Sequence, residues 1–154
     1  MRRGKEEKKR IIDGRKLKIG IVVSRFHEDL TKKMLSGAEG VLRANNVSQK
    51  NISVVWTPGT FEIPLACQKI ARKKEYDAIV AIGCVIKGGT DHYYYIAGEG
   101  VRGVMNVMLA ENIPIGLGII TTSTVTQAKD RSGGKENAGE NAARAVLQIL
   151  AQKF

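Results

Sequence analysis

Apolar residues along the chain fall either in short continuous runs or at spacings of three and four, which are the patterns of strands and of amphipathic helices. Four runs predict strands over residues 17–23, 52–56, 76–86 and 115–121. Helical spacing predicts helices over residues 28–44, 61–73, 92–111, 124–130 and 140–152. The third run, AIVAIGCVI, is almost continuously apolar, which is typical of a strand buried on both faces of a parallel sheet.

The alternation of strands with helices predicts a three-layer α/β/α sandwich around a four-stranded parallel sheet. Ligands of such sheets bind beyond the carboxyl ends of the strands. We therefore expect the segments that follow Val23, Trp56, Ile86 and Thr121 to surround one crevice.

The length and composition narrow the class of protein. With 154 residues, the chain can bury its own core, and we expect a single domain over residues 14–154. Only two cysteines, Cys67 and Cys84, and two histidines are present, which excludes a disulfide framework and a His-rich metal centre. No apolar run reaches the roughly 18 residues of a membrane span, and no apolar signal segment follows the basic N-terminus. We expect a cytoplasmic protein with no membrane contact.

The positive charge is concentrated at the N-terminus. Of the net charge of +10, residues 1–18 contribute +6, from nine Lys and Arg against three acids. The other residues carry 16 basic and 12 acidic groups, which adds only +4. We expect residues 1–13 to form a flexible, solubilising arm. The alternative is that this arm binds a polyanion such as nucleic acid.

Two glycine motifs come close to nucleotide-binding signatures. Residues 83–90 have the spacing of a phosphate-binding P-loop, but Gly89 stands where the motif needs Lys. This loop joins a strand to a helix, so its amides could hold one phosphate, or its glycines could simply make the turn. Residues 98–103 match GxGxxG, but no buried strand precedes them and the next acid, Glu111, follows too soon for a dinucleotide site. Close helix packing is the favoured explanation for some of these glycines.

A few residues carry candidate chemistry. His92 opens a helix behind the glycine loop, where the helix dipole disfavours the imidazolium and a bound phosphate favours it, a balance that suits proton transfer in either direction. Glu62 either stabilises the first turn of its helix or accepts hydrogen bonds from a polyol. Arg131 either grips phosphate or lies in solvent, and Phe26 either stacks on a flat ligand or caps the core. His27 is expected at the surface or the rim of the crevice.

Four segments together resemble the 6,7-dimethyl-8-ribityllumazine synthase family of riboflavin biosynthesis: residues 24–26 (SRF), 58–64 (PGTFEIP), 83–92 (GCVIKGGTDH) and 114–121. The resemblance covers about residues 14–152 and implies a flavodoxin-like fold. It implies a transferase that condenses 5-amino-6-(D-ribitylamino)uracil with 3,4-dihydroxy-2-butanone 4-phosphate, forms 6,7-dimethyl-8-ribityllumazine, and releases phosphate and water. It also implies that no metal or organic cofactor takes part.

The resemblance assigns roles residue by residue. His92 is similar to the proton-transfer residue of the family. For the pyrimidine substrate, the resemblance implies that Phe26 stacks on the ring, that the ring and the ribityl chain are held by Thr60, Phe61 and Glu62, and that the ring edge is recognised by the backbone of Cys84, Val85 and Ile86. For the phosphate, it implies a cradle of Gly89 and Thr90 with Arg131 as the cationic partner. It also implies that a neighbouring subunit contributes Leu117 to cover the ligand.

The resemblance also implies an assembly. Family members form pentamers, some of which build icosahedral cages of sixty subunits, and the N-terminal arm is expected to extend toward a neighbour. The short loop before the last helix favours the cage. This chain departs from the family pattern at Ala138 and Asn141, where the family has Lys and Glu, and Lys135 is a candidate substitute for the Lys.

Two alternative functions stay open. One is a catalytically reduced shell protein that packages polyanions, which the replacements at Ala138 and Asn141 allow. The other is the archaeal-type riboflavin synthase, against which residues 58–64 and His92 argue. Binding of NAD(P) through residues 98–103 is expected to fail in a cofactor titration.

Overall fold

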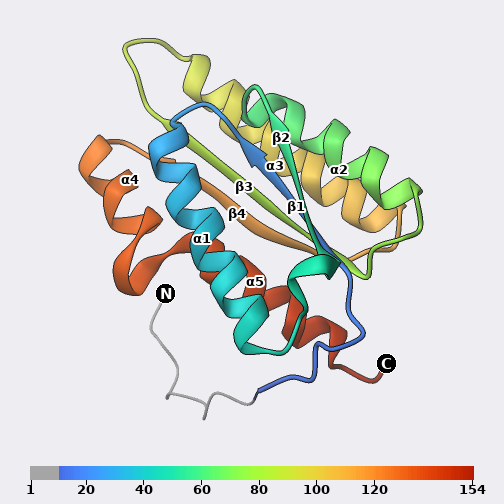
Figure 1. The fold of residues 1–154 in the computed structure, drawn as a ribbon. Coiled ribbons are helices and arrows are strands. Elements are labelled where there is room, and N and C mark those ends of the chain that lie inside the picture. The colour runs from blue at the N-terminus through green and yellow to red at the C-terminus, as the bar shows by residue number, and fades with distance from the viewer. Residues whose placement is uncertain (1–10) are drawn as a thin grey trace.

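Four strands and five α-helices make up the part of the chain that the computed structural model describes, residues 11–154 (Figure 1). The predicted arm lies outside the described residues over positions 1–10. The strands are β1 (Ile19–Ser24), β2 (Ile52–Thr57), β3 (Ala78–Ile86) and β4 (Ile115–Thr122). The α-helices are α1 (Glu28–Ala44), α2 (Ile63–Arg72), α3 (His92–Ala110), α4 (Val125–Ser132) and α5 (Ala138–Leu150).

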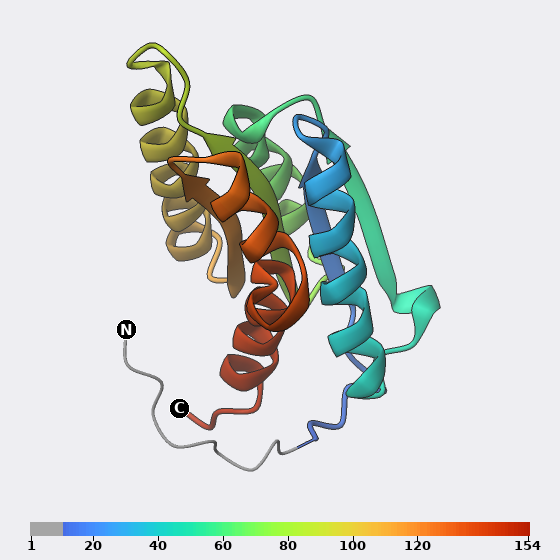
Figure 2. The same ribbon diagram turned by 90° about the vertical axis from the view of Figure 1, so that its left-hand side faces the viewer.

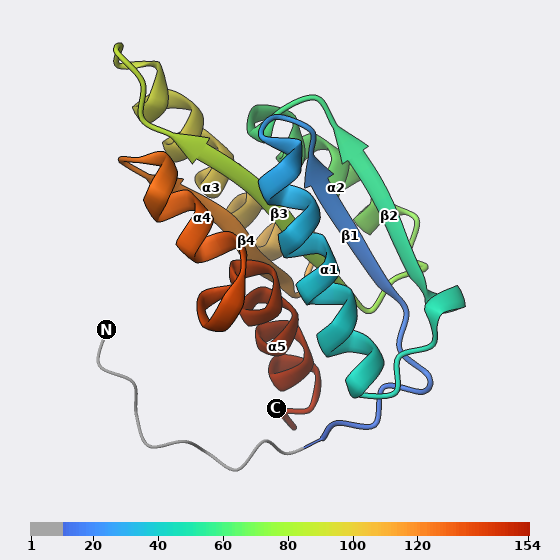
Figure 3. The same ribbon diagram turned by 60° about the vertical axis from the view of Figure 1, so that its left-hand side comes forward.

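The strands form one parallel sheet in the order β2-β1-β3-β4. Helices α1, α4 and α5 cover one face, as Figure 2 shows, and α2 and α3 cover the other, as Figure 3 shows. The predicted three-layer sandwich with a four-stranded, flavodoxin-like sheet is therefore confirmed. Each predicted element is present, with its ends moved by only a few residues. None of the helices within residues 11–154 has both the length and the apolarity that crossing a membrane requires.

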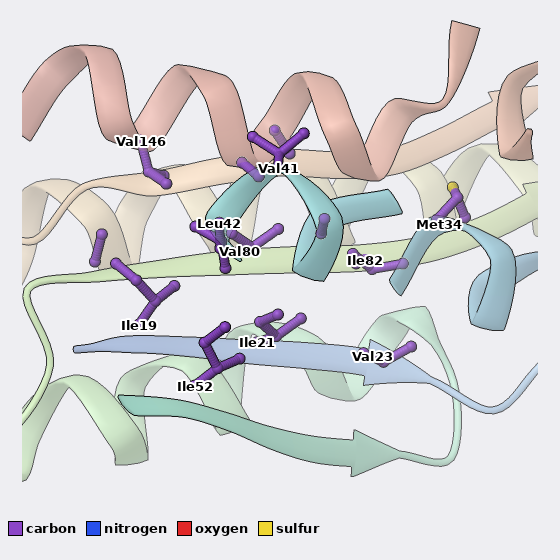
Figure 4. Close-up of a cluster of buried hydrophobic side chains, with 14 of the residues drawn as sticks. Ile19, Ile21, Val23, Met34, Val41, Leu42, Ile52, Val80, Ile82 and Val146 are labelled. Carbon is purple, nitrogen blue, oxygen red and sulfur yellow. The ribbon is translucent and has the colours of Figure 1, made fainter. Parts of the chain in front are cut away.

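The two central strands supply the core because both of their faces are covered. In β1, Ile19, Ile21 and Val23 point toward α1 and α5 (Figure 4). Val22 packs on the opposite face. The side chains of β3 alternate in the same way, and eight of its nine residues are buried. The side chains of the apolar run AIVAIGCVI are therefore packed into the hydrophobic cores on both faces of the sheet, as its composition predicts.

The first described residues already contact the end of α1. The Ile12 N–H donates to the side-chain oxygen of Asn45 at 2.8 Å, and the Gly14 N–H donates to the backbone carbonyl of Asn45 at 2.7 Å. Ile12 is half-buried and packs against the α1/α5 core. The described part of the segment that precedes β1 therefore lies along the end of α1.

Candidate functional site

A cavity of about 480 Å³ opens at the carboxyl edge of the sheet. Three segments that follow β1, β2 and β3 line it, together with the first turns of α3. In the sheet, β2 lies on one side of β1 and β3 lies on the other. The strand order therefore reverses between β1 and β3, and the cavity lies at this point, where ligands of such sheets usually bind. Nine of the predicted site residues lie around it: Phe26, Thr60, Phe61, Glu62, Cys84, Val85, Ile86, Thr90 and His92.

Backbone hydrogen bonds beyond the end of β1 place an aromatic ring at the rim. The Arg25 N–H donates to the Thr57 carbonyl at 2.8 Å, and the Phe26 N–H donates to the Pro58 carbonyl at 3.2 Å. His27 then takes a left-handed conformation, with φ of 57°, and α1 starts at the next residue. The rings of Phe26 and His27 pack edge to face with their centres 4.8 Å apart. Phe26 is 66% exposed, so its ring is free to cover a flat ligand.

The turn after β2 is tied by a carboxylate. Glu62 accepts a hydrogen bond from the Gly59 N–H at 3.0 Å, across the short 3-10 helix Thr60–Glu62. Phe61 is 58% exposed beside the cavity, whereas Thr60 is only 3% exposed and its hydroxyl has no hydrogen-bond partner among residues 11–154. Glu62 thus stabilises the entry into α2 and also borders the cavity, so both of its predicted roles are compatible with its position.

The end of β3 presents backbone and apolar side chains to the cavity. The Cys84 side chain is buried in the core on the α1/α5 face, while Val85 packs on the α2/α3 face. Burial raises the pKa of the Cys84 thiol to about 12, and Asp29 adds to the effect. Burial also raises the pKa of the Cys67 thiol to about 12. Both thiols are therefore protonated at neutral pH and are poor nucleophiles.

The loop between β3 and α3 projects past the sheet, as the arc at the upper left of Figure 1 shows. Gly88 and Thr90 line the cavity. A Cβ built on Gly89, which lies between them, would have no atom of the described residues within 4 Å apart from its chain neighbours. The His92 N–H donates to the Thr90 hydroxyl at 3.4 Å, which folds the loop into the start of α3. The His92 side chain is exposed and borders the cavity. Within residues 11–154, no backbone carbonyl accepts a hydrogen bond from the N–H groups of Gly88, Gly89 and Thr90. These amides and the N-terminus of α3 provide the donors that an anion requires.

Three predicted site residues are not part of the cavity wall within this chain. Gly89 is its immediate neighbour. Leu117 lies on the edge strand β4, on the α2/α3 side, and is 50% exposed. Arg131 is exposed on α4, which covers the opposite face of the sheet. Lys135 lines a separate, shallow hollow of about 600 Å³ around the loop between α4 and α5.

Two side chains that line the cavity are missing from the sequence interpretation: Tyr93 and Ile96. His27 lines the cavity too, in agreement with the rim position expected for it. Tyr93 and Ile96 follow His92 by one and four positions in α3. Since residues four apart share a helix face, the spacing from His92 was the available signal for Ile96.

The GxGxxG segment lies inside α3, and two of its glycines permit close packing, as expected. A Cβ at Gly100 would lie 3.0 Å from the Thr60 methyl group, and one at Gly103 would lie 2.6 Å from the Pro64 ring. Gly98 faces open space. Because the segment neither follows a strand nor opens a helix, its position does not match a dinucleotide fingerprint.

A comparison of the sequence with protein families gives one match over most of the chain. Residues 16–153 match the family described as 6,7-dimethyl-8-ribityllumazine synthase. The matched range includes all of the strands and helices described above and every residue around the cavity.

Proposed function

The chain belongs to the 6,7-dimethyl-8-ribityllumazine synthase family, and on that premise we propose that it condenses 5-amino-6-(D-ribitylamino)uracil with 3,4-dihydroxy-2-butanone 4-phosphate. The products are 6,7-dimethyl-8-ribityllumazine, phosphate and water. The family match identifies the chain as a transferase of riboflavin biosynthesis. The choice of substrates and the roles of individual residues are our proposal.

The observation that carries this proposal is the convergence around one cavity of nine residues to which the family resemblance assigns roles. They come from three segments far apart in the sequence, and only the parallel sheet brings them together. The cavity combines exposed aromatic rings, free backbone amides and an imidazole, which suit a flat heterocycle, a phosphate and a proton transfer respectively.

The proposed reaction needs positioning more than covalent chemistry. One amine of the pyrimidine attacks the ketone and loses water to form a Schiff base, phosphate is then eliminated, and the second amine closes the ring with loss of another water. Phe26 holds the ring, Thr90 and the amides of residues 88–90 hold the phosphate, and His92 moves protons between the two. Holding both substrates in one cavity makes the condensation effectively intramolecular, which is the main source of acceleration.

The test mixes purified protein with both substrates and follows lumazine fluorescence. The expected rate is well above that of the uncatalysed mixture, and an equal rate would refute the proposal. His92→Ala should lower kcat by about 100-fold without abolishing turnover, because general acid–base catalysis contributes about that much. Asp91→Asn is a matched control, since Asp91 is exposed next to His92 and does not line the cavity.

We further propose that the site is completed by a neighbouring subunit within a pentamer. Leu117 and Arg131 do not reach the cavity of their own chain, and Leu117 exposes half of an apolar side chain on the edge strand. A neighbour that supplies these two residues would cover the ligand and add a cation near the phosphate. Twelve such pentamers would form the sixty-subunit cage that the short loop before α5 favours. Light scattering distinguishes the two sizes, and a strictly monomeric species would refute both.

Mixed assemblies test the shared site directly. His92→Ala and Arg131→Ala each impair every site when expressed alone. If the two residues come from different subunits, co-expression of both variants restores intact sites at about a quarter of the interfaces. The recovered activity should therefore approach a quarter of the wild-type activity. Activity no greater than the mean of the two single variants would show that each site is built from one chain.

A further inference from the structure

The glycine loop before α3 is held by few side-chain contacts. A Cβ built on Gly88 or Gly89 would have no atom within 4 Å in the described part of the chain, its chain neighbours aside, so neither glycine packs against the described domain. Two neighbouring glycines also have the greatest conformational freedom of any residues. A loop of this kind would have to be ordered each time an anion binds to its amides, and that ordering lowers affinity.

One side-chain contact spans this loop. The ammonium group of Lys87, the residue directly after β3, lies 5.3 Å from the centre of the Tyr94 ring, in the first turn of α3. Hydrogen bonding to the Tyr94 side chain raises the pKa of Lys87. The backbone N–H of Lys87 donates a hydrogen bond to the Thr122 carbonyl, with 2.9 Å between nitrogen and oxygen, so the backbone at the Lys87 end of the contact is fixed to the sheet.

The contact continues into the cavity wall. The rings of Tyr94 and Tyr93 pack edge to face with their centres 5.2 Å apart, and Tyr93 lines the cavity beside His92. Within residues 11–154, Lys87 forms no ion pair with a carboxylate, so its charge stays available to anions near the loop. Tyr95, in contrast, is 70% exposed and has no ring contact in the same part of the chain.

We propose that Lys87 and Tyr94 act together as positioning residues that clasp the loop over residues 88–91 and preorganise its amides for the phosphate-bearing substrate. The inference rests on the proposed function for its substrate. The clasp lowers the ordering cost of binding and leaves the chemical steps to His92. It therefore acts on KM for the butanone phosphate and not on kcat.

Kinetics provide the first test. Lys87→Met and Tyr94→Ala should each raise KM for the butanone phosphate about two- to five-fold, the effect expected from loss of an exposed cation–π contact, with kcat nearly unchanged. The double variant should be no worse than either single variant. Lys87→Arg should restore KM, because a guanidinium group also binds a ring face. Tyr95→Ala is the matched control and should leave KM unchanged.

A spin label tests the loop without catalysis. Both native thiols are buried, so Gly89→Cys gives a single reactive site in open space. In the substrate-free protein, Lys87→Met and Tyr94→Ala should shift the label spectrum to higher mobility, whereas Tyr95→Ala should not. Unchanged mobility in both variants, or additive KM effects in the double variant, would overturn the clasp. Loss of lumazine formation in the wild-type protein would instead overturn the proposed function, and the label spectra would still test the clasp.

Discussion

Helices α1 and α5 approach each other closely at Gly139, which has no Cβ. A Cβ at Gly139 would lie 2.6 Å from the carbonyl carbon of Met34, where ordinary contacts begin at 3.4 Å. The neighbour is backbone inside α1, so it cannot turn away as a side chain would. Gly139→Ala therefore requires the two helices to move apart by roughly 1 Å, at the place where Met34 and Ala143 are fully buried.

The magnitude follows from two opposing effects. Replacing a helical Gly by Ala stabilises the helix by up to about 1 kcal/mol. Overpacking a core costs typically about 1–3 kcal/mol and more where backbone must move. Because backbone must move, the overpacking cost lies at the upper end of this range, about 3 kcal/mol, and the helix gain offsets about 1 kcal/mol of it. We therefore expect Gly139→Ala to lower the free energy of unfolding by about 2 kcal/mol, which corresponds to a fall in Tm of roughly 4–8 °C for a domain of this size. Gly40→Ala, in α1 with nothing within 4 Å, should raise Tm by a few degrees.

Urea unfolding followed by circular dichroism, at one protein concentration for all variants, measures both changes. Concentration is held fixed because assembly would add to the apparent stability. The reasoning predicts opposite signs for the two substitutions, with unchanged m values. A Gly139→Ala protein as stable as the wild type would show that α1 and α5 do not cross in close contact at this position.

Three further predictions concern stability. Thr60→Val should raise the free energy of unfolding by about 1–2 kcal/mol, because the buried hydroxyl of Thr60 has no hydrogen-bond partner in the described part of the chain. A decrease, measured in urea, would reveal a partner that the hydroxyl does bind. Asn137→Ala should lower the free energy of unfolding by about 2 kcal/mol in the same assay, because the buried Asn137 side chain caps α5 and donates hydrogen bonds to two backbone carbonyls. An unchanged urea midpoint would contradict that account. The pKa values of Cys67 and Cys84 are raised to about 12, so their contribution to stability is complete below pH 9 and is lost as pH rises from about 9 to about 12. Cys67→Ala, which lowers overall stability, should reduce this alkaline slope in a pH series of urea midpoints, and an equally steep slope would exclude Cys67 as a source.

Some features of the site can be recognised in short segments of the sequence. Residues 58–64 and 83–92 are two of the segments that carry the family resemblance, because each is a continuous run of neighbouring residues. Nine predicted residues then meet at one cavity, since the ends of parallel strands share an edge of the sheet. The contributions of Tyr93 and Ile96 were not foreseen because they depend on which face of α3 turns toward the sheet.

Other features required contacts between distant segments. Glu62 could be interpreted as a helix-stabilising or a ligand-binding carboxylate, and its bond to Gly59 shows how it serves the turn while bordering the cavity. The glycines in residues 98–103 have a motif-like spacing, but Gly100 and Gly103 are explained by their approach to Thr60 and Pro64. In each case the same local sequence allowed two interpretations, and only a neighbour from another element decided between them.

The sequence by itself determined the strands, the helices and the layer architecture, because hydrophobic periodicity reports which faces of an element must be buried. Hydrophobic periodicity did not determine the strand order β2-β1-β3-β4, the crossing of α1 and α5, or the contact between Lys87 and Tyr94. Those features arise from close packing between residues that are separated along the chain or lie across a turn. Tertiary structure decides them because packing depends on shape in three dimensions, which periodicity along one dimension does not encode.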